Sequence, residues 1–285
     1  MTRRLRIRHV SGYTYAGQVS SSYNEARVTP LTTTRQTAIE TSVKVTPDVP
    51  TYRYWDYWGT LVDAFDVHEP HDQLVVVGDS VVETFPPEEH IPDATWDEVG
   101  NPPPQDEVGE YLAPTAYVPA VTSLGDEALT ELIPSLAALP APAPAVAEAA
   151  KWVRSRLEYT KGITDVTTSA ADALQAGTGV CQDFAHLTLA LLRGLSIPAR
   201  YVSGYLYPAD AAAAGTRATG ESHAWVEAWT GDWWGLDPTH GDPVGERHVM
   251  VGRGRDYSDV APLKGIYHGA PAAAMHVSVE LEPVD

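Results

Sequence analysis

Residues 177–183 read Gly177-Thr178-Gly179-Val180-Cys181-Gln182-Asp183, and they contain the only cysteine of the 285-residue chain. The two glycines predict a turn, and the apolar periodicity after them predicts a helix that begins near Cys181. The free amides and the positive dipole end of such a helix favour the thiolate, which is the nucleophilic form of cysteine. Free cysteines are usually inert and buried, so a reactive thiol requires partners elsewhere in the sequence.

Two candidate partners lie downstream of this cysteine. His223 lies in the segment 222–229, where small and large residues alternate as they do in a strand whose two faces differ. Asp237 directly follows a second candidate strand, 233–236, and the loop 230–232 between the strands contains the Gly-Asp pair of a hairpin turn. Neighbouring strands would bring His223 and Asp237 side by side, and a helix packed across them would bring the thiol to the imidazole.

These three residue types suit nucleophilic attack on an amide or ester carbonyl. Cys181 would be the nucleophile, His223 would accept and return the thiol proton, and Asp237 would fix the imidazole tautomer. The oxyanion that develops needs donors, and the backbone N–H of Cys181 is one by position. We place Tyr159 as a second donor candidate, and Gln182 and Trp225 as residues of the substrate cleft.

Four motifs occur in the same order as in a known family. They are Gly-x-Gly-x-Cys-x-Asp-Phe-Ala-x-Leu at 177–187, Leu-Ser-Ile-Pro-Ala-Arg-Tyr-Val-Ser-Gly-Tyr at 195–205, Ser-His-Ala-Trp-Val-Glu at 222–227 and Leu-Asp-Pro-Thr at 236–239. This region, about 145–245, resembles the core of the bacterial transglutaminase-like superfamily. The resemblance implies an α+β, papain-like fold with a Cys-His-Asp triad at Cys181, His223 and Asp237.

The rest of the chain carries weaker signatures of the same family. The segments Asp-Tyr-Trp-Gly at 56–59 and Pro-His-x-x-Leu-x-Val at 70–76 resemble the β-rich N-terminal domain that accompanies this core in bacteria. The segment 252–260 is similar to the C-terminal signature of the family. One departure is Thr60, where asparagine is usual.

The sequence predicts three parts. Residues 1–85 alternate as an antiparallel β domain does, residues 86–143 form a connection rich in proline and acidic residues, and residues 144–285 form the catalytic core with its C-terminal tail. Within these parts we expect helices at 126–132, from about Pro144 onward, at 170–175 and after Cys181. We also expect the β domain to dock on the core and to narrow its cleft.

Composition excludes several partners. The chain has 38 acidic and 19 basic residues, a formal net charge of −19, which disfavours nucleic acid and anionic membranes. No stretch approaches the roughly 20 apolar residues of a membrane span. The N-terminus resembles no signal peptide, and an unpaired catalytic thiol suits the cytoplasm. We therefore expect a cytoplasmic protein whose partner is a peptide or another amide-containing substrate.

Other candidate ligands and acids have simpler explanations. The acidic and histidine cluster at 66–72 matches no closed zinc pattern, so we predict no metal site and no cofactor. His186 is expected to be a packing residue and His240 a turn residue. Asp183 is expected to stabilise the helix N-terminus.

Two classes of function stay open. The first is an enzyme that breaks or exchanges an amide through a thioester, with water as acceptor in a peptidase or amidase and an amine as acceptor in a transglutaminase. We favour hydrolysis, because water needs no second binding site. The second class is a binding or scaffold module that keeps the fold without turnover, as the fold alone does not determine activity.

Overall fold

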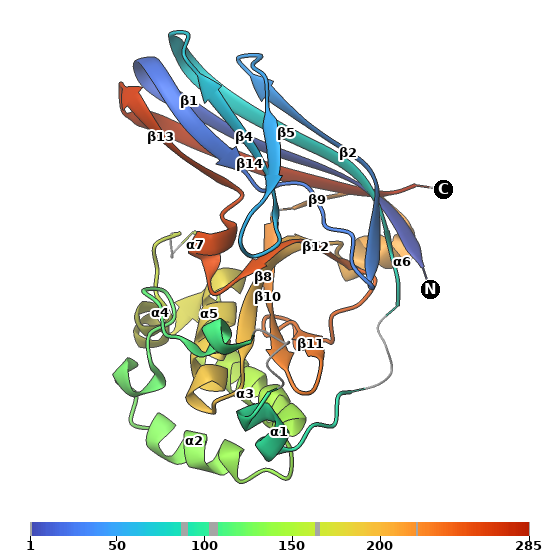
Figure 1. The fold of residues 1–285 in the computed structure, drawn as a ribbon, viewed down its shortest axis with the longest axis vertical. Coiled ribbons are helices and arrows are strands. Elements are labelled where there is room, and N and C mark those ends of the chain that lie inside the picture. The colour runs from blue at the N-terminus through green and yellow to red at the C-terminus, as the bar shows by residue number, and fades with distance from the viewer. Residues whose placement is uncertain (1, 87–90, 103–107, 163–165, 221, 285) are drawn as a thin grey trace.

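The structure of the chain, a computed structural model, describes residues 2–86, 91–102, 108–162, 166–220 and 222–284. It has two parts: a large curled sheet above and a smaller sheet surrounded by helices below (Figure 1). Of the connection between them, residues 91–95 lead into α1 (Trp96–Gly100), which lies at the lower end of the molecule (Figure 1).

The upper part is one antiparallel sheet of eight strands. Its strands are β1 (Arg3–Ala26), β2 (Gln36–Thr46), β3 (Tyr52–Trp55), β4 (Leu61–Val67), β5 (His71–Thr84), β9 (Ala218–Gly220), β13 (Leu263–Gly269) and β14 (Ala272–Pro283). The long strand β1 lies at its centre, between β5 and β14. Alternate residues at the start of β1, such as Leu5 and Ile7, are buried, which is the predicted alternation of a sheet with one covered face.

The C-terminal strands belong to this upper sheet, and not to the catalytic core as the sequence division assumed. β14 pairs antiparallel with β1 from Leu5 opposite Pro283 to Tyr15 opposite Ala272, and β13 pairs with the far half of β1. The physical reason is that a strand has two hydrogen-bonding edges: β5 pairs along one edge of β1, and β14 supplies the partners along the other. The chain therefore starts and ends in the same sheet, and both termini lie at its same end (Figure 1).

The lower part contains the helix-borne cysteine and a four-stranded antiparallel sheet in the order β11-β10-β8-β12. Its strands are β8 (Ala199–Leu206), β10 (Ser222–Trp229), β11 (Trp233–Leu236) and β12 (His248–Gly254), with a small parallel pair β6 (Glu158–Tyr159) and β7 (Thr178–Gly179). The remaining helices are α2 (Leu129–Ala137), α3 (Pro142–Arg156), α4 (Ala170–Ala176), α5 (Cys181–Gly194), α6 (Ala209–Ala214) and α7 (Tyr257–Val260), with the short 3₁₀ helices η2 (Gly109–Leu112) and η3 (Val121–Ser123). The α+β class predicted from the sequence is confirmed.

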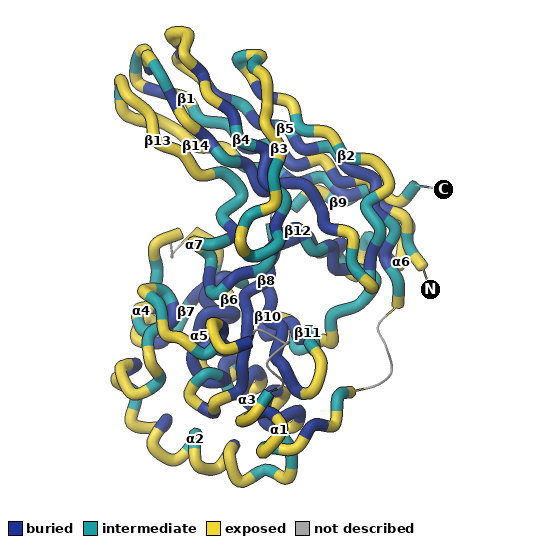
Figure 2. Tube along the Cα trace, in the orientation of Figure 1, coloured by how far each residue is buried: buried dark blue, intermediate teal, exposed yellow. Residues whose placement is uncertain are grey.

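Helix α5 is the buried centre of the lower part. It packs against β10, α3 and α4, and every residue from Gln182 to Leu192 is buried. Figure 2 shows this helix and β8 and β10 in the colour of buried residues, while α2 and the outer ends of the upper strands are exposed. Because other elements surround α5, its small and polar residues are buried as well as its apolar stripe.

Helix boundaries differ from the sequence prediction at two places. The helix expected from Pro144 begins at Pro142, and both prolines suit a first turn that needs no N–H donor. The helix expected at 126–132 runs from Leu129 to Ala137 and contains Pro134 in its interior. Pro134 is the sixth residue of this helix and has no N–H to donate. The carbonyl that loses its helical hydrogen bond is therefore that of Thr130, in the first turn.

The two parts share one hydrophobic cluster, so the β domain is docked on the core. Leu5, Val82 and Leu281 of the upper sheet pack in this cluster with Tyr205 and Val249 of the lower sheet. Side-chain hydrogen bonds also join β2 of the upper sheet to β12 of the lower one: Gln36 Nε2 donates to the carbonyl of Met250 at 2.8 Å, and Gln36 Oε1 accepts from the amide of Met250 at 2.7 Å. This docking was predicted, and the shared core accounts for it.

Candidate functional site

A cavity of about 380 Å³ lies where the upper sheet meets the lower part, and Cys181 and His223 both line it. The lower part contributes residues of α5, β8 and β10, and the upper sheet contributes residues of β1 and β14. The described lining residues are His9, Ser11, Tyr13, Tyr159, Val166, Val180, Cys181, Gln182, Tyr201, Ser203, Ser222, His223, Ala224, Tyr257, Pro262, Leu263, Met275 and Val277.

The turn before α5 fixes the position of Cys181. Gly177 ends α4 with a φ of 69°, a left-handed conformation that glycine adopts without strain. A side chain at Gly179 would lie 2.7 Å from Cβ of Asp183, so only glycine fits there. The Asp183 carboxylate accepts a hydrogen bond of 2.8 Å from the amide of Val180, which confirms the predicted role at the helix N-terminus. Cys181 is then the first residue of α5.

The hairpin of β10 and β11 brings His223 and Asp237 together. The pairing runs from Trp229 opposite Trp233 to Val226 opposite Leu236, and Gly231 turns the chain with a φ of 102°. His223 lies three residues before Val226, and Asp237 follows Leu236, so the two side chains meet at the same end of the hairpin. Nε2 of His223 lies 2.7 Å from Oδ2 of Asp237. Cys181 lies close enough to His223 to raise the pKa of the imidazole, and both residues line the cavity.

Asp237 is fully buried and accepts hydrogen bonds from three imidazoles. Besides His223, Oδ2 is 2.9 Å from Nδ1 of His240 and 3.4 Å from Nε2 of His248. Oδ1 accepts a hydrogen bond of 2.9 Å from the amide of Thr239 in the following turn. With both oxygens engaged, the carboxylate cannot rotate away from His223 without losing several hydrogen bonds.

This geometry sets the charges of the group. Burial opposes a charge on His223, yet its hydrogen bond to Asp237 and the nearby Cys181 raise its pKa to about 10. Burial acts to raise the pKa of Asp237, but the three imidazole hydrogen bonds hold it well below its usual range. Burial lowers the pKa of His248, because Asp237 compensates only in part and the charge on His223 opposes a second one. At neutral pH the group therefore contains an imidazolium, a carboxylate and a neutral histidine.

The same group has the donor types of a metal site. Single ligand atoms of His223, Asp237 and His248 lie within 4.8 Å of one another, the one such group among the described residues. Each of these histidine nitrogens already lies within hydrogen-bonding distance of the carboxylate. A metal ion would have to displace those hydrogens, so the arrangement suits proton transfer better than metal binding.

The predicted cleft residues have different positions. Tyr159 lines the cavity from β6 and is 46% exposed. Gln182 also lines it, and its Nε2 lies 3.4 Å from the carbonyl oxygen of Val166, to which it donates. Trp225 is not among the described lining residues: it is buried behind His223, with ring centroids 6.2 Å apart. The prediction for Trp225 is therefore corrected. Residues two apart on a strand share a face, so Trp225 lies on the same face of β10 as His223, but it is buried in the protein interior and does not reach the cavity.

Two of the minor predictions are also settled. His186 is fully buried between the rings of Tyr117 and Tyr201, at centroid distances of 5.2 and 5.1 Å, which confirms a packing role. His240 occupies a turn as predicted, but its imidazole also contacts Asp237. His248 was missed entirely, since it comes from β12 and joins the site only because β12 pairs with β8.

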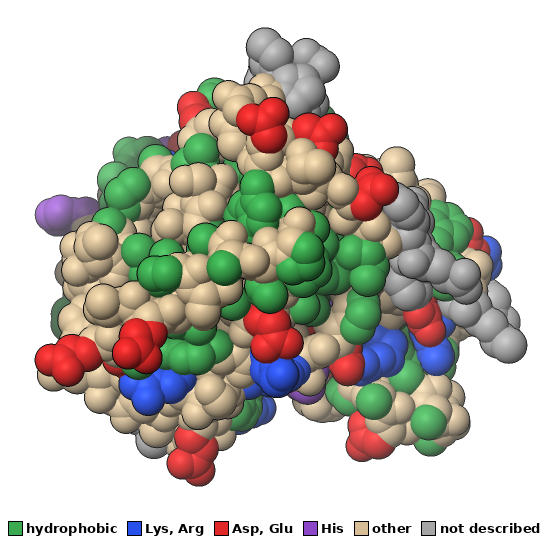
Figure 3. Space-filling model, turned by 90° about the horizontal axis from the view of Figure 1, so that it is seen from below, with side chains coloured by type: hydrophobic (Ala, Val, Ile, Leu, Met, Phe, Trp, Pro, Cys, Tyr) green, Lys and Arg blue, Asp and Glu red, His purple; other side chains and the backbone are tan. Residues whose placement is uncertain are grey.

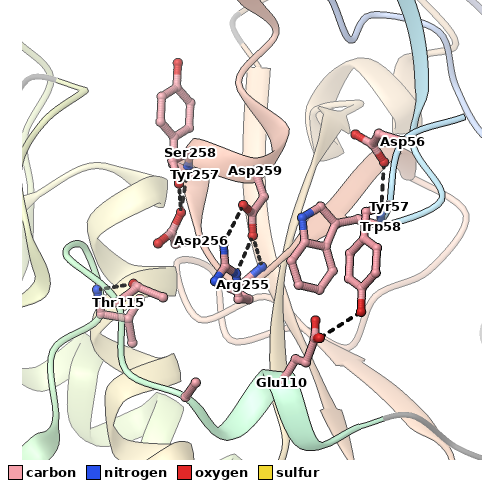
Figure 4. A network of polar contacts seen from close by, with 12 residues as sticks. Asp56, Tyr57, Trp58, Glu110, Thr115, Arg255, Asp256, Tyr257, Ser258 and Asp259 are labelled. Atoms are coloured by element: carbon pink, nitrogen blue, oxygen red, sulfur yellow. Dashed lines mark hydrogen bonds and ion pairs between the residues drawn. The ribbon is translucent and has the colours of Figure 1, made fainter. Parts of the chain in front are cut away.

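The front and tail motifs of the sequence meet each other near the cavity. The guanidinium of Arg255 lies over the ring of Trp58 at 5.1 Å, and the Tyr57 hydroxyl donates to Glu110 at 2.7 Å (Figure 4). Arg255 is held by Asp259 at 3.0 Å, at the turn that starts α7. The two motifs therefore join the β domain to the core.

This contact continues to the cavity wall. The amide of Tyr257 donates to Nε2 of His186 at 3.2 Å, and Tyr257 itself lines the cavity. Thr60, the departure noted in the sequence, is fully buried, and its Oγ1 lies 3.4 Å from the amide of Arg253 in β12. Threonine thus takes part in the docking contact at this position.

The outer surface offers no comparable grouping on the face that the space-filling view shows. Figure 3 shows acidic and basic side chains scattered around hydrophobic ones, without one patch of a single charge. Among the described residues, no helix combines the length and apolarity that a membrane span requires.

Comparisons with known proteins agree with this architecture. The family described as "Transglutaminase-like superfamily" matches residues 132–238, and "Bacterial transglutaminase-like N-terminal region" matches residues 5–83. An uncharacterized protein of Mycobacterium leprae is 48% identical over 278 residues, 98% of each chain, and one of Mycobacterium tuberculosis is 34% identical over 320 residues, covering 100% of this chain and 94% of the other.

Among solved structures, a protein of Cytophaga hutchinsonii named "Putative Cysteine Protease" superposes with a TM-score of 0.76 at 25% identity, covering 100% of this chain and 93% of that one. The family matches cover both parts of the chain, and the structural likeness extends over its whole length. The chain therefore belongs to the transglutaminase-like superfamily and carries the bacterial transglutaminase-like N-terminal region.

Proposed function

We propose that the protein is a cysteine-dependent hydrolase of amide bonds that acts through a thioester on Cys181. The observation that supports this most strongly is that Cys181 and His223 line the same cavity, while Nε2 of His223 lies 2.7 Å from the buried carboxylate of Asp237. The superfamily membership and the likeness to the Cytophaga hutchinsonii protein support the same general class.

The proposed reaction has two stages. The Cys181 thiolate, paired with the His223 imidazolium, attacks the carbonyl carbon, and the resulting oxyanion is stabilised by the backbone N–H of Cys181. His223 then gives its proton to the leaving amine, the C–N bond breaks and a thioester forms. In the second stage His223 takes a proton from water, the hydroxide adds to the thioester, and the thiolate leaves with the carboxylic acid as product.

Asp237 acts on this reaction through His223. Its carboxylate accepts the Nε2 hydrogen, which leaves Nδ1 as the nitrogen that exchanges the proton with the thiol. The hydrogen bonds from His240 and His248 keep the carboxylate oriented. Because a thiol nucleophile must stay reduced, a reducing compartment such as the cytoplasm is part of the proposal.

Trapping the thioester tests the proposal. The protein is mixed with an activated ester or a peptide library, quenched in acid, and measured as intact mass, with Cys181→Ala as the control. We expect an acyl adduct on the wild type, located on Cys181, that decays in water. Addition of a primary amine then decides the acceptor: accumulation of the acid supports hydrolysis, and quantitative conversion to the amide would assign a transglutaminase-type transfer instead. Absence of any adduct would favour a binding module.

A further inference from the structure

One strand of the upper sheet has an edge without a strand partner beside the cavity of the candidate site. β14 pairs with β1 along one edge, and along its outer edge it pairs with β9 only from Val279 to Leu281. From Ala274 to Ser278, no strand in the described part of the chain pairs with the outer edge. Such an edge presents a row of free N–H and C=O groups that another extended chain can bind.

This edge lacks the features that usually protect an exposed strand. The segment 274–278 reads Ala-Met-His-Val-Ser, without proline and without lysine, arginine, aspartate or glutamate. Its pairing with β1 is regular from Ala274 opposite Thr14 to Ser278 opposite Val10, and the register shift of this strand pair comes only beyond Ala274. Five regular residues are the length of an ordinary strand, so the edge suits one short extended segment.

Strand β9 shows that the same edge accepts a strand and where the next positions lead. Gly220 of β9 lies opposite Val279, and the chain then leaves this edge for β10, which begins at Ser222. His223 follows Gly220 by three residues, so their Cα atoms are at most about 11 Å apart. A segment that occupied the next positions along β14 would therefore start close to the histidine of the proposed reaction.

Side chains of the unpaired stretch face the cavity. Met275 and Val277 line it, and Tyr13, directly opposite Met275 on β1, lines it as well. Because neighbouring strands lie about 4.8 Å apart with their faces in common, alternate side chains of an added segment would share the face of Met275 and Val277. None of the described lining residues is aspartate, glutamate, lysine or arginine, so this face favours apolar side chains over charged ones.

We propose that the outer edge of β14 from Ala274 to Ser278 is a docking site, to which an extended segment of a polypeptide substrate with apolar residues at alternate positions adds as a further strand. This inference rests on the proposed function, since it identifies the occupant as the substrate of Cys181. Backbone pairing would supply the affinity, and the alternate side chains would supply the selectivity. The β domain would thus hold the substrate chain beside the reactive groups.

Peptide binding to Cys181→Ala, which lacks the thiol, tests the backbone pairing. The probe is the fluorescein-labelled peptide Thr-Val-Thr-Val-Thr-Val-Lys, and two isomers carry N-methyl groups on the three valines or on the three threonines. Successive residues of a strand direct their N–H groups to opposite edges, so only one isomer loses the donors that face β14. By fluorescence anisotropy, one isomer should bind at least about tenfold more weakly than the parent and the other within about threefold. Equal affinities of the two isomers would overturn the docking site.

Hydrogen exchange measured by NMR locates the binding edge. Saturating parent peptide should slow exchange at least about tenfold at outward-facing amides within 274–278 of Cys181→Ala. Amides of 279–281, where β9 already pairs, are the internal control and should not change.

A pair of aspartate variants, each combined with Cys181→Ala, tests the apolar face. Met275→Asp places a carboxylate beside the docked segment and should weaken binding of the parent peptide at least about tenfold. Ile266→Asp, the matched change at a 72% exposed residue of β13, should leave the affinity unchanged. Equal affinities of the two variants would contradict the proposed apolar selectivity.

The results separate failure of the docking site from failure of the proposed function. If iodoacetamide fails to alkylate Cys181 in the wild type, the proposed function is wrong and this inference falls with it. If Cys181 is alkylated but the peptide leaves exchange in 274–278 unchanged, only the docking site is overturned. Protection of 274–278 in the free protein that rises with protein concentration would assign the edge to a second copy of the chain and would also overturn the docking site.

Discussion

Replacing Asp237 by asparagine removes a buried charge and changes the shape of the side chain very little. The amide oxygen can still accept from the backbone amides of the following turn, as Oδ1 does in the wild type. The amide nitrogen, however, would replace the oxygen that accepts from His223, His240 and His248. His223 would then have to present a bare Nε2 and keep its hydrogen on Nδ1, the nitrogen that faces the thiol.

The size of the effect follows from the pKa of His223. A rise from about 6.5 to about 10 corresponds to about 5 kcal/mol in favour of the imidazolium, and it is achieved although burial opposes it. Without the carboxylate, burial should dominate and the pKa of His223 should fall below about 6.5. Turnover should fall by about 10⁴, because the imidazole is held in the wrong tautomer.

Two measurements follow the change. Histidine-selective NMR titration, assigned with His223→Gln, should give a pKa of His223 near 10 in the wild type and below about 6.5 in Asp237→Asn. The second measurement is the free energy of unfolding in urea. Because the pKa of His223 is raised in the folded state, its protonation contributes stability that is complete below about pH 6.5 and is lost as the pH rises through about 10. The stability difference between wild type and Asp237→Asn should therefore shrink over that window.

Asp232→Asn, an exposed aspartate in the turn of the same hairpin, is the matched control and should change neither quantity. The reasoning would be refuted if His223 in Asp237→Asn still titrated above pH 8, because another group would then be stabilising the imidazolium.

Two further variants test the packing that supports the site. Glu227→Gln should lower the free energy of unfolding by about 3 kcal/mol in urea titrations, because Arg200, 2.6 Å away and buried, would lose its countercharge. The control Glu148→Gln, at an exposed ion pair, should lower it by less than about 0.5 kcal/mol. Equal losses of stability in the two variants would contradict the argument. Gly204→Ala should cost at least about 2 kcal/mol by the same assay, since its methyl group would lie 2.1 Å from a carbonyl oxygen of β12. The control Gly220→Ala, with no atom within 4 Å of the added methyl group, should leave the free energy of unfolding almost unchanged. If Gly204→Ala were as stable as the wild type, the strands would be able to move apart and admit the methyl group.

The parts of the site that could be predicted depend on short-range patterns. A glycine turn followed by an apolar helix placed Cys181, and a two-strand hairpin placed His223 beside Asp237; both signals lie within about a dozen residues. The ordered motifs then indicated the superfamily, which the family matches confirm.

Long-range pairing explains what could not be predicted. Leu5 pairs with Pro283 in the upper sheet, and nothing local in either segment indicates that partner. His248 reaches Asp237 only through the pairing of β12 with β8, and His9 reaches the cavity only because β1 docks on the core. An exposed and a buried strand can show similar alternation, so the sequence identified strands without indicating which face would form the cavity.

The rate of Cys181 alkylation by iodoacetamide at pH 6 is the most direct test of the central claim. At this pH an ordinary thiol is less than about 1% thiolate and reacts slowly. We predict rapid, stoichiometric alkylation of the folded wild type at Cys181 and a rate at least about tenfold lower in His223→Ala, because the imidazolium that stabilises the thiolate is gone. If the wild type reacted only as fast as free cysteine and His223→Ala changed nothing, Cys181 would not be the activated nucleophile that this account requires.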